Sequence, residues 1–103
     1  MAKRVRDYEE DLVEQLKDAE FAAEYLNASL DDADDGADER FLMALGQVAK
    51  AHGMTAISEK SGMARQAMYR ALSENGNPEL STLKALLDAM GLKLAIEQKP
   101  RAS

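Results

Sequence analysis

The stretch from Met54 to Ser73 constrains the fold most, because two short helical patterns in it are separated only by Ser61 and Gly62. A short turn that contains glycine is typical of two helices that cross tightly. A left-handed backbone at Gly62 costs glycine less than it costs other residues. The apolar contacts between the two helices are expected from Ile57, Met63, Met68 and Leu72. We therefore predict a helix-turn-helix, with a first helix over 55–61 and a second over about 63–72.

One side of the second helix carries residue types that suit DNA. On a helical wheel this arc holds Arg65, Gln66, Tyr69 and Arg70. The opposite arc is apolar and holds Ala67, Met68, Ala71 and Leu72. Arginine can reach guanine O6 and N7, glutamine can reach adenine N6 and N7, and tyrosine and arginine both bond phosphates. The pattern favours a DNA-binding surface and leaves open an ordinary solvated helix pair in a small bundle.

Two helical segments precede a polar, aspartate-rich linker at residues 31–38. Their apolar residues recur at helical spacing: Leu12, Val13, Leu16, Phe21, Ala22, Tyr25, Leu26 and Leu30. Such a stripe either packs on its own domain or lies in a groove of another protein. The candidate contacts with a partner protein are Phe21, Tyr25, Leu26 and Leu30.

Two further helices flank the helix-turn-helix. The first follows Asp38, a candidate N-cap, and ends near His52 and Gly53, because glycine commonly terminates helices. The second follows Ser81, another candidate N-cap, and ends at Gly91. Their inward-facing residues are expected to be Phe41, Leu42, Leu45, Val48 and Ala49 in the first and Leu83, Leu86, Leu87 and Met90 in the second.

The period of the apolar residues changes after Gly91. Leu92, Leu94 and Ile96 alternate with Lys93, Ala95 and Glu97, and a period of two is typical of a β-strand. A lone strand cannot satisfy its backbone groups, and the chain offers no convincing second strand. We expect two copies to pair residues 92–97 across a two-fold axis, which gives the homodimer that palindromic DNA sites require.

The net charge of −6 is unevenly distributed. Residues 1–39 contain four basic and fourteen acidic side chains, a net charge of −10. Residues 40–103 contain nine basic and five acidic side chains, a net charge of +4. Because cations neutralise DNA phosphates, only the second part suits DNA, and the acidic first part indicates a basic partner.

Several other classes of protein are disfavoured. With no cysteine and a single histidine, His52, the chain has no zinc-binding pattern, and we expect no metal or other cofactor. The linker at 31–38 fails the EF-hand pattern, because Ala33 and Leu42 stand at liganding positions. The carboxylates lie in solvated runs without a catalytic partner, which argues against an enzyme. The chain has no signal peptide or membrane-spanning run, so we expect a cytoplasmic protein.

Two segments resemble a known family. Gly62 to Leu94, GMARQAMYRALSENGNPELSTLKALLDAMGLKL, looks like the addiction-module antidote proteins, HigA-like antitoxins with a λ-repressor-type (Xre-like) helix-turn-helix. Lys17 to Leu30 is similar to the front of that family, so the likeness covers roughly residues 7–97. Two positions depart from it: Ala64 replaces the usual capping Ser or Asn, and Ser58 replaces an Ala in the preceding helix.

The resemblance implies an all-α fold, a λ-repressor-like helix-turn-helix domain with an N-terminal helical arm and a short C-terminal β-strand. We expect an acidic arm and linker over 1–37, the DNA-binding domain with its strand over 38–97, and a disordered tail over 98–103. The family's role is that of an antitoxin in a type II pair, which represses its operon by binding double-stranded operator DNA and neutralises a basic RelE/ParE-like toxin. A stand-alone helix-turn-helix repressor and a helical module that binds only protein are the alternatives.

Overall fold

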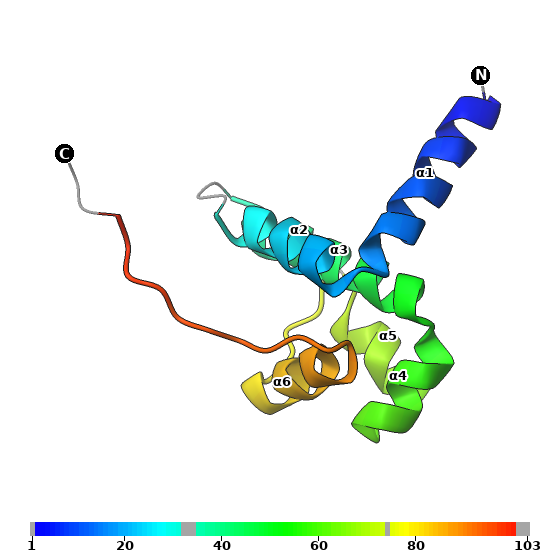
Figure 1. Ribbon diagram of the computed structural model, residues 1–103. Helices are drawn as coiled ribbons and strands as arrows, with labels where there is room; N and C mark the ends of the chain where they lie inside the picture. The colour runs from blue at the N-terminus through cyan, green and yellow to red at the C-terminus, as the bar shows by residue number, and fades with distance from the viewer. Residues whose placement is uncertain (1, 32–34, 74, 101–103) are drawn as a thin grey trace.

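Six α-helices are present in the part of the chain that the structure describes (Figure 1). The computed structural model describes residues 2–31, 35–73 and 75–100, with side chains from residue 8 onward. The helices are α1 (Ala2–Leu16), α2 (Ala19–Asp31), α3 (Ala37–His52), α4 (Met54–Ser61), α5 (Arg65–Ala71) and α6 (Leu80–Ala89). The prediction of a helical fold is confirmed.

Helix α3 lies at the centre of the packing. α1, α2 and α4 all pack against it, and α4 also packs against α5 and α6. The predicted inward stripe of α3 is buried along its whole length, and the small residues Ala44 and Ala51 widen it. Small side chains let neighbouring helices approach closely, so α3 can support a helix on more than one side.

The apolar stripe of the first two helices packs on the chain's own core. Leu16 and Ala22 are fully buried and Leu26 is nearly so. The Tyr25 hydroxyl donates a hydrogen bond to Oε1 of Gln47 at 2.6 Å, which ties α2 to α3. The N-terminal part of α1 extends away from the other helices (Figure 1). One hydrophobic core therefore includes residues on both sides of residue 37.

Glycines end the helices where the sequence predicts. Gly53 follows α3 with a φ of 96°, and Gly91 follows α6 with a φ of 78°. At such positive φ angles a residue with a side chain would be strained. The predicted N-caps are wrong. Gly36 caps α3 and Glu79 caps α6, neither with a side-chain hydrogen bond, and Asp38 and Ser81 lie in the first turns. Asp38 still suits its position, because a carboxylate in a first turn is favourable to the helix dipole.

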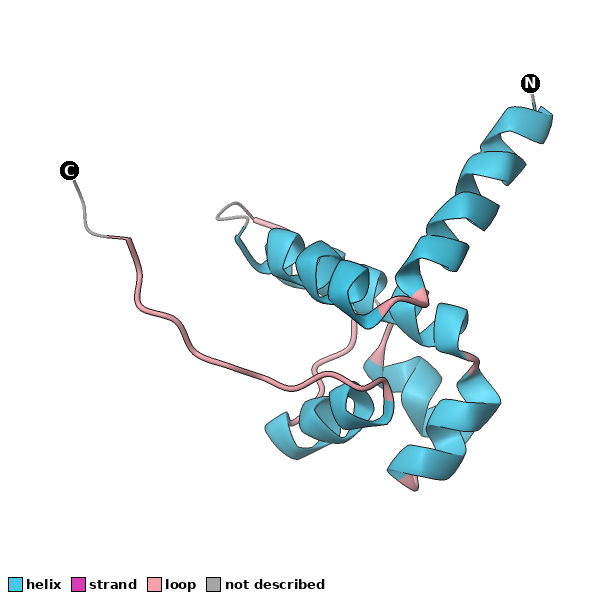
Figure 2. Ribbon diagram, viewed as in Figure 1, coloured by secondary structure: helices cyan, strands magenta, loops and turns pink. Residues whose placement is uncertain are grey.

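The predicted C-terminal β-strand is not formed. Residues 92–100 are extended without strand pairing (Figure 2). The Leu92 amide donates to the carbonyl of Leu87 at 2.8 Å, but within the described part of the chain residues 93–100 have no backbone hydrogen bond. The alternating pattern specifies an extended backbone, whereas a strand also needs a partner, and the single chain supplies none.

Some expectations fall partly outside the described residues. The polar linker at 31–38 includes residues 32–34, and the tail at 98–103 includes residues 101–103, all of which lie outside them. Across the described ranges, no helix combines the length and the apolar character that crossing a membrane requires.

Candidate functional site

The turn between α4 and α5 is closed by hydrogen bonds around Gly62. Gly62 has φ 76° and ψ 7°, the left-handed conformation predicted for it, and its amide donates to the carbonyl of Ser58 at 3.0 Å. The Ser58 hydroxyl donates to the carbonyl of Met63 at 2.5 Å, and the Met63 amide donates to Oγ of Ser61 at 3.2 Å. Two serines and one glycine therefore fix how α5 leaves α4.

The role of Ser58 is not evident from the sequence, where it is only a small residue in place of Ala. In the fold its half-buried hydroxyl bridges the turn. The signal available in the sequence is its place, four residues before a glycine that ends a helix. A hydroxyl there can reach backbone groups freed by the helix end.

The apolar side of α5 joins it to the core as predicted. Met68 is fully buried, Ile57 is 1% exposed and Leu72 is buried at the end of the helix. Met63 packs against this cluster from the turn. These contacts orient α5, so its opposite side is turned outward.

The four predicted DNA-binding residues lie together on the outward side of α5 and are all exposed: Arg65, Gln66, Tyr69 and Arg70. The Arg65 Nη2 donates to the Tyr69 hydroxyl at 3.4 Å, one helical turn away. Tyr69 is 54% exposed although it is aromatic. The arc thus presents two guanidinium groups, an amide and a phenol to solvent, a donor-rich set suited to base edges and phosphates.

The start of α5 lacks a side-chain cap. Ala64 is the N-cap residue, with the extended backbone that this position requires and no side-chain hydrogen bond. Its carbonyl accepts the Met68 amide at 3.1 Å. The structure therefore shows no side-chain cap at the position where Ala64 replaces the usual capping Ser or Asn.

The connection after α5 returns tightly against the end of that helix. The Gly76 amide donates to the carbonyl of Ser73 at 2.8 Å. A Cβ on Gly76 would collide with the carbonyl oxygen of Ala71 and would lie 2.9 Å from those of Arg70 and Ser73. This close approach is the physical requirement for glycine in the Gly76-Asn77-Pro78 turn.

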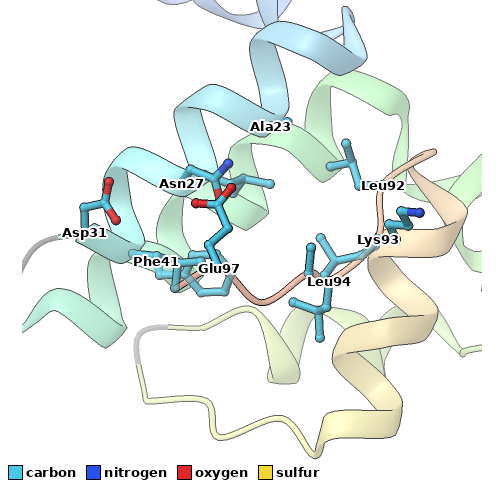
Figure 3. A pocket seen from close by; sticks show the side chains of 12 residues that line it. Ala23, Asn27, Asp31, Phe41, Leu92, Lys93, Leu94 and Glu97 are labelled. Atoms are coloured by element: carbon cyan, nitrogen blue, oxygen red, sulfur yellow. The ribbon is translucent and has the colours of Figure 1, made fainter. Parts of the chain in front are cut away.

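A second feature is a groove of about 220 Å³ between α2 and the extended segment after α6 (Figure 3). We call it the α2–tail groove. The large apolar residues in its lining are Leu26, Leu30, Phe41, Leu87, Leu92 and Leu94. The polar residues in its lining include Asn27 and Asp31 from α2 and Lys93 and Glu97 from the tail.

This groove brings together residues that the sequence assigns to different partners. Leu26 and Leu30, predicted to contact a partner protein, lie with Leu92 and Leu94, predicted to join two copies. Leu26 forms buried lining and Leu30 is 53% exposed. Ile96 does not line the groove and is fully exposed.

The other two predicted partner contacts do not line this groove. Phe21 and Tyr25 stack with ring centroids 6.4 Å apart and are both partly buried against the core. The hydrogen bond from Tyr25 to Gln47 faces α3. Of these four residues, only Leu26 and Leu30 line the groove.

His52 lies at the end of α3, as expected, with Nδ1 3.1 Å from the carbonyl oxygen of Val48. Among the residues that the structure describes, no group of three or more histidine, aspartate and glutamate side chains could hold a metal ion.

Comparison with known proteins covers nearly the whole chain. The model of a family described as "Probable addiction module antidote protein" matches residues 7–98. An uncharacterized protein of Haemophilus influenzae is 33% identical over 98 residues, which cover 95% of this chain and 96% of that relative. No solved structure matches the chain.

Proposed function

This chain belongs to the family of probable addiction module antidote proteins, and from that membership we propose that it is the antitoxin of a type II toxin–antitoxin pair. In this proposal it is a HigA-like antitoxin whose λ-repressor-type (Xre-like) helix-turn-helix represses its operon in the cytoplasm. It neutralises a basic RelE/ParE-like toxin by direct contact. The observation that carries the proposal is the family match over residues 7–98, which include both α5 and the α2–tail groove.

The outward side of α5 supports binding to double-stranded operator DNA. The B-DNA major groove is about 12 Å wide and admits an α-helix. Arg65 and Gln66, in the first turn of α5, are placed to read base edges, and Tyr69 and Arg70 to bond bases or phosphates. The chemistry of these four residues and their exposure to solvent support this assignment.

The extended tail supports a homodimer. Its backbone groups from residue 93 to residue 97 have no partner within the described part of the chain, and its apolar residues alternate. We propose that two copies pair there, through Leu92, Leu94 and Ile96 and the backbone between them. A dimer would present two α5 helices to half-sites about one helical turn of DNA apart.

The uneven charge supports a basic toxin as partner. Residues 1–39 carry a net charge of −10, and complementary charge raises the rate at which partners associate. The toxin would be drawn to α1 and α2 and would stay clear of α5.

One observation favours a second candidate, a stand-alone repressor. Leu16, Ala22 and Leu26 are buried in the chain's own core, so no partner protein is needed to explain the apolar stripe on α1 and α2. In that case the acidic helices only complete the fold.

Co-expression with a basic protein encoded by the adjacent gene tests the proposal. The complex is co-purified and then assayed for a mobility shift of the upstream promoter at about physiological salt, because phosphate contacts weaken strongly as salt rises. A complex that also shifts the promoter supports the antitoxin. A shift without a co-purifying partner supports the stand-alone repressor, and the absence of any shift contradicts both.

A further inference from the structure

We propose that the α2–tail groove is the docking site for the toxin, with the extended C-terminal segment as one of its walls. The proposal rests on the antitoxin function proposed above. It moves the expected toxin surface from Phe21, Tyr25, Leu26 and Leu30 to Leu30, Asp31 and the tail residues opposite them.

The groove combines a fixed floor with accessible walls. Leu26, Phe41 and Leu87 are each at least nine-tenths buried, so the bottom of the groove is held by the core. Leu30 on α2 is 53% exposed, and Leu94 on the tail is 40% exposed. A partner that covered these two half-exposed leucines would be stabilised, because burial of apolar area is favourable.

The charges around the groove select a basic occupant. Asp31 on α2 and Glu97 on the tail bring a carboxylate to each wall, against one amine, that of Lys93 (Figure 3). The exposed Glu20 and Glu24 continue the acidic row along the same side of α2, since residues four and eleven positions apart share a helix face. An inserted apolar side chain flanked by Lys or Arg fits this pattern.

A second copy of the chain suits the groove less well. Its own α2 carries the same acidic row, so two such faces would repel each other. Pairing of two tails uses backbone groups in the plane of the strands, whereas the groove uses side chains that point out of that plane. A dimer formed through the tails therefore leaves the groove wall in place.

The test compares Leu30→Glu with Leu80→Glu in the full chain. Leu80 is 65% exposed, lies on α6 and does not line the groove. The probe is the purified basic protein from the adjacent gene, with affinity measured by calorimetry or surface plasmon resonance. We expect Leu30→Glu to weaken binding at least about tenfold, because a carboxylate would be desolvated in an apolar contact. Leu80→Glu should stay within about twofold of the unchanged chain.

Glu97→Lys tests the other wall, because Glu97 lines the groove from the tail and is not among the residues proposed for the dimer. Promoter binding by each variant shows that the fold is intact. Weakened toxin binding by both Leu30→Glu and Glu97→Lys, with promoter binding retained, supports the proposal. Toxin binding by both variants at the affinity of the unchanged chain overturns it. A Leu30→Glu variant that loses the dimer and keeps the toxin assigns the groove to a second copy and also overturns it. If the unchanged chain binds no toxin, the proposed function itself fails.

Discussion

The Ser58 hydroxyl donates a hydrogen bond to the carbonyl oxygen of Met63 at 2.5 Å, across the turn that separates α4 from α5. The bond spans Gly62, whose left-handed backbone reverses the chain. This turn sets the direction in which α5 leaves α4 and presents its outward side. Ser58 is therefore a positioning residue for a surface that it does not touch.

Ser58→Ala should lower the free energy of unfolding by about 1 kcal/mol, because it removes a hydrogen bond and leaves a carbonyl with one partner fewer. Urea denaturation followed by circular dichroism measures this. Ser81→Ala is the matched control: Ser81 is exposed in the first turn of α6 and should change stability by less than about 0.5 kcal/mol. Equal midpoints for the two variants would contradict the role of Ser58.

Ala64→Ser should stabilise the protein by about 1 kcal/mol, because a serine hydroxyl at the N-cap can accept a hydrogen bond from an amide in the first turn of α5. The midpoint of thermal unfolding reports the gain. The same substitution at Ala28, exposed inside α2, should cost roughly 0.5 kcal/mol, since serine is the poorer helix former. A loss of stability at both positions would show that α5 is capped in another way.

Gly46→Ala and Gly76→Ala should have opposite signs. Gly46 lies inside α3 with open space around its Cβ position, so alanine should add up to about 1 kcal/mol of stability. At Gly76 the new methyl group would meet three carbonyl oxygens, so the chain after α5 must shift, and we expect a loss of about 1–3 kcal/mol. Denaturation of the two variants in parallel decides the matter. If Gly76→Ala leaves the free energy of unfolding unchanged, this turn can shift to accommodate the methyl group without cost.

Arg65→Ala should weaken promoter binding about 5- to 150-fold and relax preference at one base pair, if Arg65 reads a guanine. Lys17→Ala removes the same charge from the turn after α1, where Lys17 makes an exposed ion pair with Glu14 at 2.9 Å. That control should leave promoter affinity nearly unchanged. Titrations against the promoter and against fragments with single base changes distinguish the two variants, and equal losses would place DNA contact elsewhere.

The helical part of the fold could be predicted because its determinants are local. Gly53, Gly62 and Gly91 end their helices, and each has the positive φ that favours glycine. The buried stripe of α3 follows directly from helical spacing. The outward side of α5 follows from the same rule, so the four polar residues are exposed where the sequence places them.

Determinants that depend on tertiary contacts could not be predicted. Asp38 and Ser81 are good capping residues, but the chain enters both helices earlier, through Gly36 and Glu79. The alternating tail fixes an extended backbone and not its partner. Helical spacing places Leu26 and Leu30 on one apolar stripe, and only the packing of α2 on α3 decides that Leu26 is core and Leu30 is surface.

One core around α3 supports both the proposed DNA-binding surface and the proposed toxin-binding surface, so we expect the two to unfold together. Leu16, Ala22 and Leu26 cover one side of a helix whose Leu45 and Val48 belong to the same buried cluster as Met68 of α5. A small single core of this kind melts as one cooperative unit. Heat or urea should therefore abolish DNA binding and toxin binding at the same midpoint. A truncation that removes α1 and α2 would expose the buried side of α3 and so destabilise α5 as well.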